Sequence, residues 1–174
     1  MIKKAFMWLR TRIAYSKKKT FRHQSFDKAG KIGILLNNPD FTQNDSINRF
    51  VRTLKDQGKE VAVLCFLDEG VNRLYDFPYL ELRKKDLTLT GGFQSEKINN
   101  FVKSRFDYLY SINISPFLPF KNILSRNQSA VRIGKYFSGS DKYLDIMIDM
   151  QDKDDLQSLI KKMNELIPNL SFHD

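Results

Sequence analysis

The residues of this sequence that could carry out chemistry are a few acidic side chains and one cysteine. Asp145 and Asp149 lie four residues apart in an apolar run, so on one strand they would share a face. Paired carboxylates of this kind can support acid–base or metal chemistry. The commoner explanation is that they mark the beginning and the end of a strand. They remain the candidate acids only if the chain is an enzyme.

A nucleotide site would have to lie in the loops that follow the apolar runs. The first such loop, residues 37–42, reads Asn-Asn-Pro-Asp-Phe-Thr and contains neither a glycine nor a Lys-Ser/Thr pair. The sequence therefore has neither the dinucleotide fingerprint nor the P-loop here. Asp68 and Glu69 follow the second run, where a ribose-binding acid would stand, but without the glycines a solvated turn explains them better.

Cys65 stands inside the apolar run at residues 61–66, with no histidine near it in the sequence. We expect it to be a small buried core residue and not a nucleophile. A single cysteine excludes a disulfide framework and indicates a reducing compartment. The sequence thus predicts no catalytic residue, no cofactor and no metal site.

The strongest functional signal is the uneven distribution of charge. Residues 1–30 contain nine Lys or Arg and one acid, Asp27, which gives +8. The whole chain has 29 basic and 20 acidic residues, so residues 31–174 hold 20 and 19, or +1. A localised basic block predicts a polyanionic partner, either nucleic acid or an anionic membrane surface.

The basic block has the pattern of an amphipathic helix. Ile2, Ala5, Phe6, Leu9 and Ile13 fall on one face of a helical wheel. Aromatic residues interleave with cations around the rest of the arm. In an RNA-binding interpretation the cations meet phosphates while two aromatic rings stack on bases. The predicted nucleic-acid-binding residues are Lys3, Lys4, Trp8, Arg10, Arg12, Tyr15, Lys17, Lys18, Lys19 and Arg22.

Other interpretations of the same arm stay open. Its apolar stripe would also suit docking on the body of the protein or pairing with a partner helix. It would equally suit a helix lying in the plane of a membrane surface. An arginine-bearing N-terminus with few acids resembles a mitochondrial presequence, although lysine outnumbers arginine here. No apolar run approaches the roughly 18 residues that a membrane-spanning helix needs.

In the body, apolar runs alternate with amphipathic stretches, a pattern that is typical of a parallel sheet covered by helices. The run Lys31–Leu36 predicts the first strand. We expect residues 32–36 to be central, between strands at Val61–Phe66 and Tyr108–Ile112. The predicted fold is a three-layer Rossmann-like α/β sandwich with a mostly parallel sheet. Residues 1–28 form a basic helical arm and linker before it, and residues 29–174 form the domain.

Several of these segments together resemble an uncharacterised domain family of Bacteroidota proteins, over nearly the whole chain. The segments include residues 31–35, Phe106-Asp107-Tyr108-Leu109, Arg132-Ile133-Gly134-Lys135-Tyr136 and residues 143–149. The resemblance implies a cytoplasmic bacterial protein, which disfavours a presequence, and it brings no known catalytic residues.

The Phe-Asp-x-Leu and Arg-Ile-Gly strands are also similar to the N-terminal half of heptosyltransferase-like glycosyltransferases. That likeness supports the fold alone, because the chain ends before the second half that supplies the sugar-nucleotide site. We therefore expect a non-enzymatic RNA-binding protein associated with ribosomes. The alternatives are a peripheral membrane protein and a half-size glycosyltransferase-like enzyme.

Overall fold

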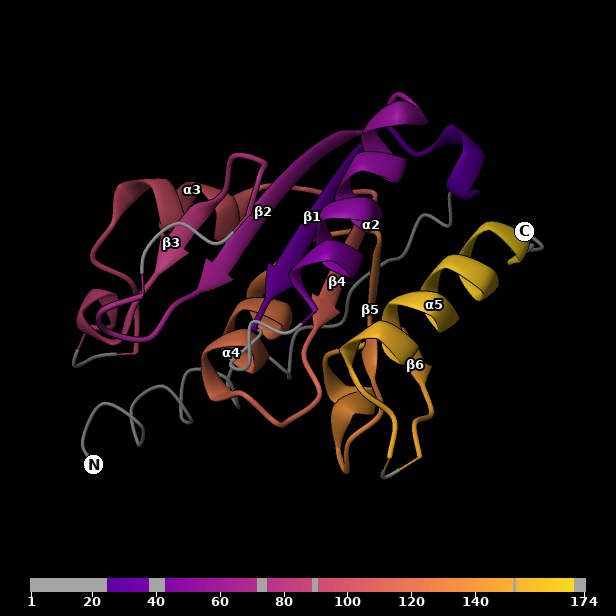
Figure 1. Ribbon diagram of the computed structural model, residues 1–174. Coiled ribbons are helices and arrows are strands. Elements are labelled where there is room, and N and C mark those ends of the chain that lie inside the picture. Colours follow the sequence, from indigo (N-terminus) through magenta and orange to yellow (C-terminus); the bar gives the residue numbers. More distant parts are fainter. Residues whose placement is uncertain (1–24, 38–42, 72–74, 89–90, 152, 171–174) are drawn as a thin grey trace.

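A six-stranded sheet with all strands parallel forms the centre of the molecule (Figure 1). The computed structural model describes residues 25–37, 43–71, 75–88, 91–151 and 153–170. The strands are β1 (Lys31–Leu36), β2 (Glu60–Phe66), β3 (Leu80–Leu82), β4 (Tyr108–Ile112), β5 (Val131–Lys135) and β6 (Ile146–Ile148). Their order is β3-β2-β1-β4-β5-β6, so β1 is central between β2 and β4, as predicted.

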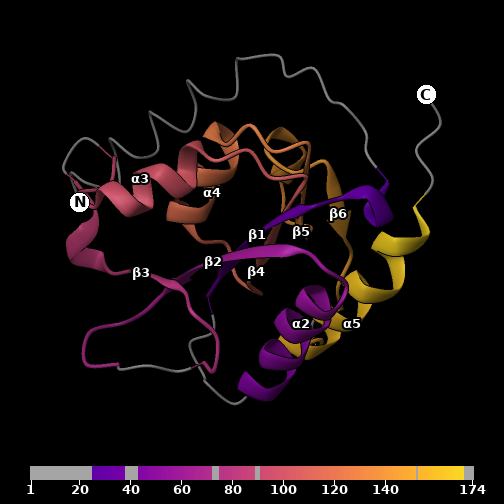
Figure 2. The same cartoon turned by 90° about the horizontal axis from the view of Figure 1, so that it is seen from above.

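Two pairs of helices cover the two faces of this sheet. Figure 2 shows α2 and α5 on one side and α3 and α4 on the other, which confirms the predicted three-layer Rossmann-like sandwich. The helices are α2 (Asn44–Asp56), α3 (Glu96–Lys103), α4 (Leu118–Arg126) and α5 (Leu156–Leu166). Short 3-10 turns are η1 (Phe26–Lys28), η2 (Lys84–Asp86), η3 (Ser140–Lys142) and η4 (Ile167–Asn169).

Local signals set the helix ends. The Ser95 side chain accepts a hydrogen bond from the Ile98 N–H at 3.5 Å, and Asp155 accepts one from the Ser158 N–H at 2.9 Å. Both residues thereby satisfy backbone donors that the first turn of a helix leaves unpaired. The bond from the Ser158 N–H also holds the pKa of Asp155 below its usual value. Beyond α2, Gly58 adopts φ +76°, a left-handed conformation that glycine tolerates best.

The sheet separates two hydrophobic cores. Tyr108 and Tyr110 of β4 pack with Ile34 on the side of α2 and α5, whereas Leu35 and Leu109 face α3 and α4. Gly33 makes the second core possible, because a Cβ there would lie 2.7 Å from the Phe106 ring and 2.8 Å from Leu109. A residue with a side chain would force these groups away from the sheet.

Two segments need a comment on where they begin. Helix α4 begins at Leu118, and Pro119 in its first turn is compatible with the helix. Phe26, which the division at residue 28 places in the arm, lies in the core, with its ring 5.6 Å from that of Tyr108. The core of the body therefore includes Phe26.

Candidate functional site

A shallow hollow lies where β4 and β5 end, next to the point at which the strand order reverses. β1 and β4 are neighbours with connections that leave in opposite directions, and ligands of open α/β sheets bind beyond such a point. The hollow measures about 260 Å³ with the solvent in its mouth included. Its polar lining consists of Ser111, Asn113, Lys121, Lys135 and Tyr143.

The polar groups of this hollow hold one another. The Ser111 hydroxyl donates to Asn113 Oδ1 at 2.6 Å, and Asn113 Nδ2 donates to the Ser115 carbonyl at 2.6 Å. Lys135 Nζ donates to the Ile114 carbonyl at 3.3 Å. These bonds fix the loop between β4 and α4. Its geometry supports a structural role.

The prediction from sequence did not find these residues. Ser111 and Asn113 stand at the end of β4 and in the loop after it, without a glycine-rich or catalytic motif. A count of the polar residues at the end of each expected strand would have pointed to them, because those ends meet at one edge of a parallel sheet.

Asp145 and Asp149 lie at opposite ends of β6, just before Ile146 and just after Ile148. Asp145 forms a two-pronged ion pair with Arg132, with Nη2–Oδ1 at 2.7 Å and Nε–Oδ2 at 2.8 Å. It also accepts the Arg132 backbone N–H at 2.8 Å. The two acids stand at the two ends of the strand, as their interpretation as strand ends expects.

Asp68 and Cys65 also make contacts that stabilise the fold. Asp68 pairs with Lys84 at 3.3 Å, and its carbonyl accepts a hydrogen bond from Arg83, so it joins the β2 and β3 ends of the sheet. Burial, reinforced by the charge of Glu81, raises the pKa of the Cys65 thiol to about 12. The thiol is protonated at neutral pH and is a poor nucleophile, as expected for a core residue.

The predicted nucleic-acid-binding residues lie outside the described part of the chain. They are Lys3, Lys4, Trp8, Arg10, Arg12, Tyr15, Lys17, Lys18, Lys19 and Arg22. The structure does describe the junction from which they extend. Lys59 Nζ donates to the carbonyls of Phe26 and Asp27 at 2.9 and 3.0 Å and lies 5.1 Å from the centre of the Phe26 ring. The junction is therefore anchored to the body.

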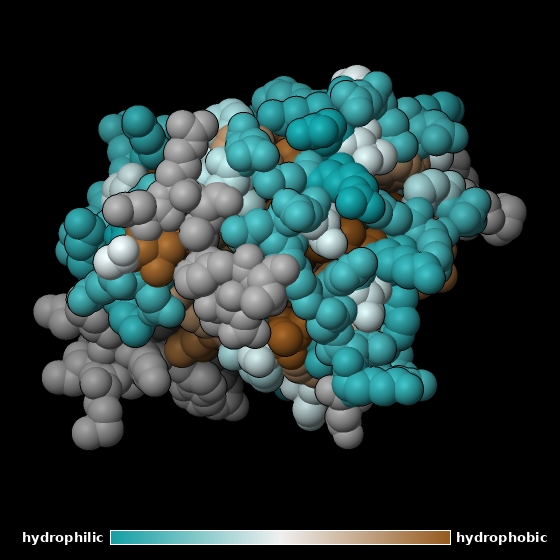
Figure 3. Space-filling view, viewed as in Figure 1, coloured by the Kyte–Doolittle hydropathy of each residue, from teal (hydrophilic) through white to brown (hydrophobic). Residues whose placement is uncertain are grey.

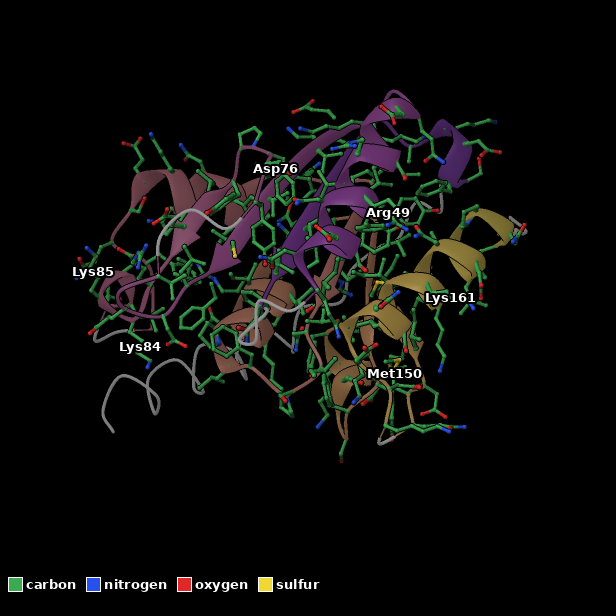
Figure 4. All side chains as sticks on the ribbon, viewed as in Figure 1. Arg49, Asp76, Lys84, Lys85, Met150 and Lys161 are labelled. Carbon is green, nitrogen blue, oxygen red and sulfur yellow. The ribbon has the colours of Figure 1, made fainter. Side chains whose placement is uncertain are left out.

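Charged side chains of the body are frequently paired. Lys31 contacts Glu60 at 3.7 Å, and Lys162 contacts Asp154 at 2.9 Å. Figure 3 shows the face over α2 and α5 as mainly hydrophilic, with apolar side chains in scattered patches. Figure 4 shows Lys84 and Lys85 close together at the left of the molecule, away from Arg49 on α2 and Lys161 on α5.

The described residues were also compared with what a metal site and a membrane-spanning helix require. Across the described ranges, no three His, Cys, Asp or Glu side chains come together as a metal site would require. The helices in the same ranges are all too short or too polar to cross a lipid bilayer.

The strand order and the two helical layers define a Rossmann-like α/β protein. Within that class, the chain belongs to the family described as "family of unknown function (DUF6913)", whose model matches residues 3–169. The match includes most of the basic arm together with the body. No curated protein and no solved structure matches the chain.

Proposed function

We propose that this chain is a non-enzymatic RNA-binding protein of the bacterial cytoplasm, associated with ribosomes, whose basic arm supplies the contacts to RNA. The observation that carries the proposal is the division of charge. Residues 1–30 hold +8, and residues 31–174 hold +1. Phosphate groups attract such a block strongly, and the displaced counterions add to the affinity.

The anchored junction supports this assignment. Phe26 is buried in the core and Lys59 binds the backbone beside it, so the arm starts from a fixed point on a nearly neutral body. A body with little net charge adds little non-specific attraction of its own. Binding to a polyanion should then depend on the arm alone.

The aromatic residues of the arm favour RNA among the possible polyanions. Trp8 and Tyr15 stand among lysines and arginines, and exposed bases of single-stranded RNA stack on such rings. An anionic membrane is the competing partner, because Ile2, Phe6 and Leu9 could enter its surface. A glycosyltransferase-like enzyme would instead need a sugar-nucleotide site, and the small hollow between β4 and β5 gives no support for one.

The experiment measures the affinity of the full chain for single-stranded RNA over a series of salt concentrations. We expect the logarithm of the affinity to fall linearly with the logarithm of the salt concentration. Lys18→Ala with Lys19→Ala should reduce this slope by up to about two if both side chains meet phosphates. Trp8→Ala should weaken binding at every salt concentration, by roughly 1–3 kcal/mol if the indole stacks on a base.

Lys84→Ala with Lys85→Ala is the matched control. It removes two neighbouring lysines from the surface of the body (Figure 4) and should leave the slope unchanged. Equal slopes for the two double variants would contradict the proposal. Capture of the chain by vesicles containing anionic lipid, lost on Phe6→Ala or Leu9→Ala while RNA does not bind, would establish the membrane alternative instead.

A further inference from the structure

The two edges of the sheet differ in the side chains that they present. Each edge strand has three residues, with β3 at one end of the sheet and β6 at the other. The central residue of β3 is Glu81, an exposed acid that binds Arg83 at 2.8 Å. Charged side chains of this kind protect an edge strand from pairing with another chain. The central residue of β6 is Met147, which is apolar and 38% exposed.

Exposed apolar side chains gather at the β6 end of the sheet. In the part of the chain that the structure describes, the large apolar side chains that are exposed are Tyr136, Met147 and Leu166. Leu166 is one turn beyond Lys162 on the same flank of α5. That flank faces the edge, because Lys162 Nζ donates to the carbonyl of Asp149, just after β6. Figure 1 shows β6 and α5 together at one end of the molecule.

The backbone of Met147 points to the free edge of β6. The Tyr136 N–H donates to the Ile148 carbonyl at 2.9 Å, so Tyr136 lies beside the end of β6 and that carbonyl points toward β5. Backbone groups alternate in direction along a strand, and the N–H and carbonyl of Met147 therefore point away from β5. The Ser140 hydroxyl holds the Met147 side chain by donating to its sulfur at 3.2 Å. Met147 thus offers one backbone donor and one acceptor beside an apolar side chain.

We propose that the free edge of β6 pairs with β6 of a second copy of the chain, antiparallel and about a two-fold axis through Met147. The two copies of Met147 then exchange two hydrogen bonds, and one sheet continues through both chains. A pair of such short strands cannot supply the roughly 1,200–2,000 Å² that a specific interface buries. Tyr136 and Leu166 extend the contact beyond the strands.

The balance of charge favours a second copy as the occupant of this edge. Residues 131–151, which contain β5 and β6, hold three cations and three acids, namely Arg132, Lys135, Lys142, Asp141, Asp145 and Asp149. A strongly charged edge would repel its own copy, whereas a balanced edge gives a polyanion little attraction. In the proposed register Asp145 of one copy lies opposite Asp149 of the other. Arg132 offsets this repulsion, because it binds Asp145 through two hydrogen bonds.

This inference goes beyond RNA binding and does not rest on it. If both proposals hold, a dimer carries two basic arms, and contact of the second arm with the same RNA molecule becomes intramolecular. The affinity for a long RNA would then rise without any new kind of contact.

The test measures the molar mass of the full chain by sedimentation equilibrium over a range of protein concentrations, without RNA. A salt concentration of about 0.15 M screens the charge of +9 that each chain carries. We expect the mass to rise from 20.4 kDa toward twice that value as the concentration increases. Met147→Lys should stay monomeric, because it sets two cations against each other across the axis. Glu81→Lys, at the centre of the other edge, is the matched control and should associate like the unaltered chain.

A second pair of variants tests the contact made by α5. Leu166→Lys should weaken the association about tenfold, because it removes an apolar side chain from the interface. Asn164→Lys is its matched control, since residue 164 lies about 160° from residue 166 around the helix, and it should have no effect. Leu166→Lys also decides the question if Met147→Lys fails to fold.

Disulfide formation locates the contact between the two copies. A two-fold axis through residue 147 sets its two Cα atoms about 5.5 Å apart, a separation that a disulfide can span. Under the same mild oxidant, Met147→Cys should form a linked dimer at least about tenfold faster than Glu81→Cys. The native Cys65 is buried and should take no part.

The proposal is wrong if the unaltered chain stays monomeric at every concentration, which would leave the edge to a strand of another protein. It is also wrong if the folded lysine variants at residues 147 and 166 associate as strongly as the unaltered chain. Equal rates of disulfide formation for Met147→Cys and Glu81→Cys would place the contact elsewhere and overturn it as well. Because no RNA is present, failure here leaves the RNA-binding test unaffected.

Discussion

At the scale of single residues, the pair formed by Arg132 and Asp145 is the most consequential contact of the body. The exposed fractions of the two side chains are 6% and 18%, and two short hydrogen bonds join them. Arg132 also donates to the Leu124 carbonyl at 3.2 Å, which connects the pair to α4. One residue pair therefore ties β5, the start of β6 and a covering helix together.

Removal of either partner should leave a buried charge without compensation. We expect Arg132→Ala to lower the free energy of unfolding by about 3–5 kcal/mol. Urea denaturation measures the change, and Asp145→Ala in a double-mutant cycle should show strong coupling. Lys161→Ala is the control. Lys161 contacts Glu165 at 4.0 Å on the surface, and its loss should cost less than about 0.5 kcal/mol. A small effect of Arg132→Ala would mean that the pair is dispensable.

At the scale of elements, β1 determines how closely the second helical layer approaches the sheet. Its Gly33 lies beneath the Phe106 ring, with no room for a methyl group. The same strand starts after Gly30, where an added Cβ would meet its nearest neighbour only at 3.9 Å. Substitutions of Gly33 and Gly30 can therefore be compared directly, because the two positions differ mainly in the space that an added Cβ would have.

Gly33→Ala should destabilise the fold by about 1–3 kcal/mol through overpacking. Gly30→Ala should change the stability by less than about 0.5 kcal/mol, since the new methyl group makes only an ordinary van der Waals contact with Asp107. Thermal and urea unfolding of the two variants would measure this contrast. Equal effects would show that the packing of Phe106 on β1 is loose.

Elements with strong local signals could be predicted from the sequence. The apolar run of β1, the cap at Ser95 and the glycine after α2 each specify their own segment through short-range chemistry. The Arg132–Asp145 pair could not be predicted, because it depends on the register of β5 against β6. The burial of Asn122 could not be predicted either, since a polar residue on an outer helix is ordinarily exposed. The pairing of β5 with β6, which no local pattern encodes, decides the first of these cases.

At the scale of the whole molecule, the junction between arm and body falls before Phe26. Its ring packs on Tyr108, and η1 contacts η4 near the other end of the described chain. The first turn of the structure therefore helps to close the core between the two ends of the chain.

Phe26→Ala should lower the free energy of unfolding by about 3 kcal/mol, because it leaves a cavity beside Tyr108. Asp27→Ala, one residue further along on the exposed side of η1, should have little effect. Chemical denaturation of both variants provides the measurement. If the two changes cost the same, the first turn would not belong to the core.

The central position of β1 has a consequence for synthesis of the protein. Among the strands that the structure describes, β1 leaves the ribosome before the others, and β2 can pair with it about 30 residues later. Its other edge needs β4, whose partner residues begin at Tyr108, opposite Ile32. During the intervening synthesis one side of a highly apolar strand has no neighbour, and a bare edge of this kind invites pairing with other nascent chains. The order of translation thus leaves a largely buried central strand of the finished protein half-covered until β4 is made.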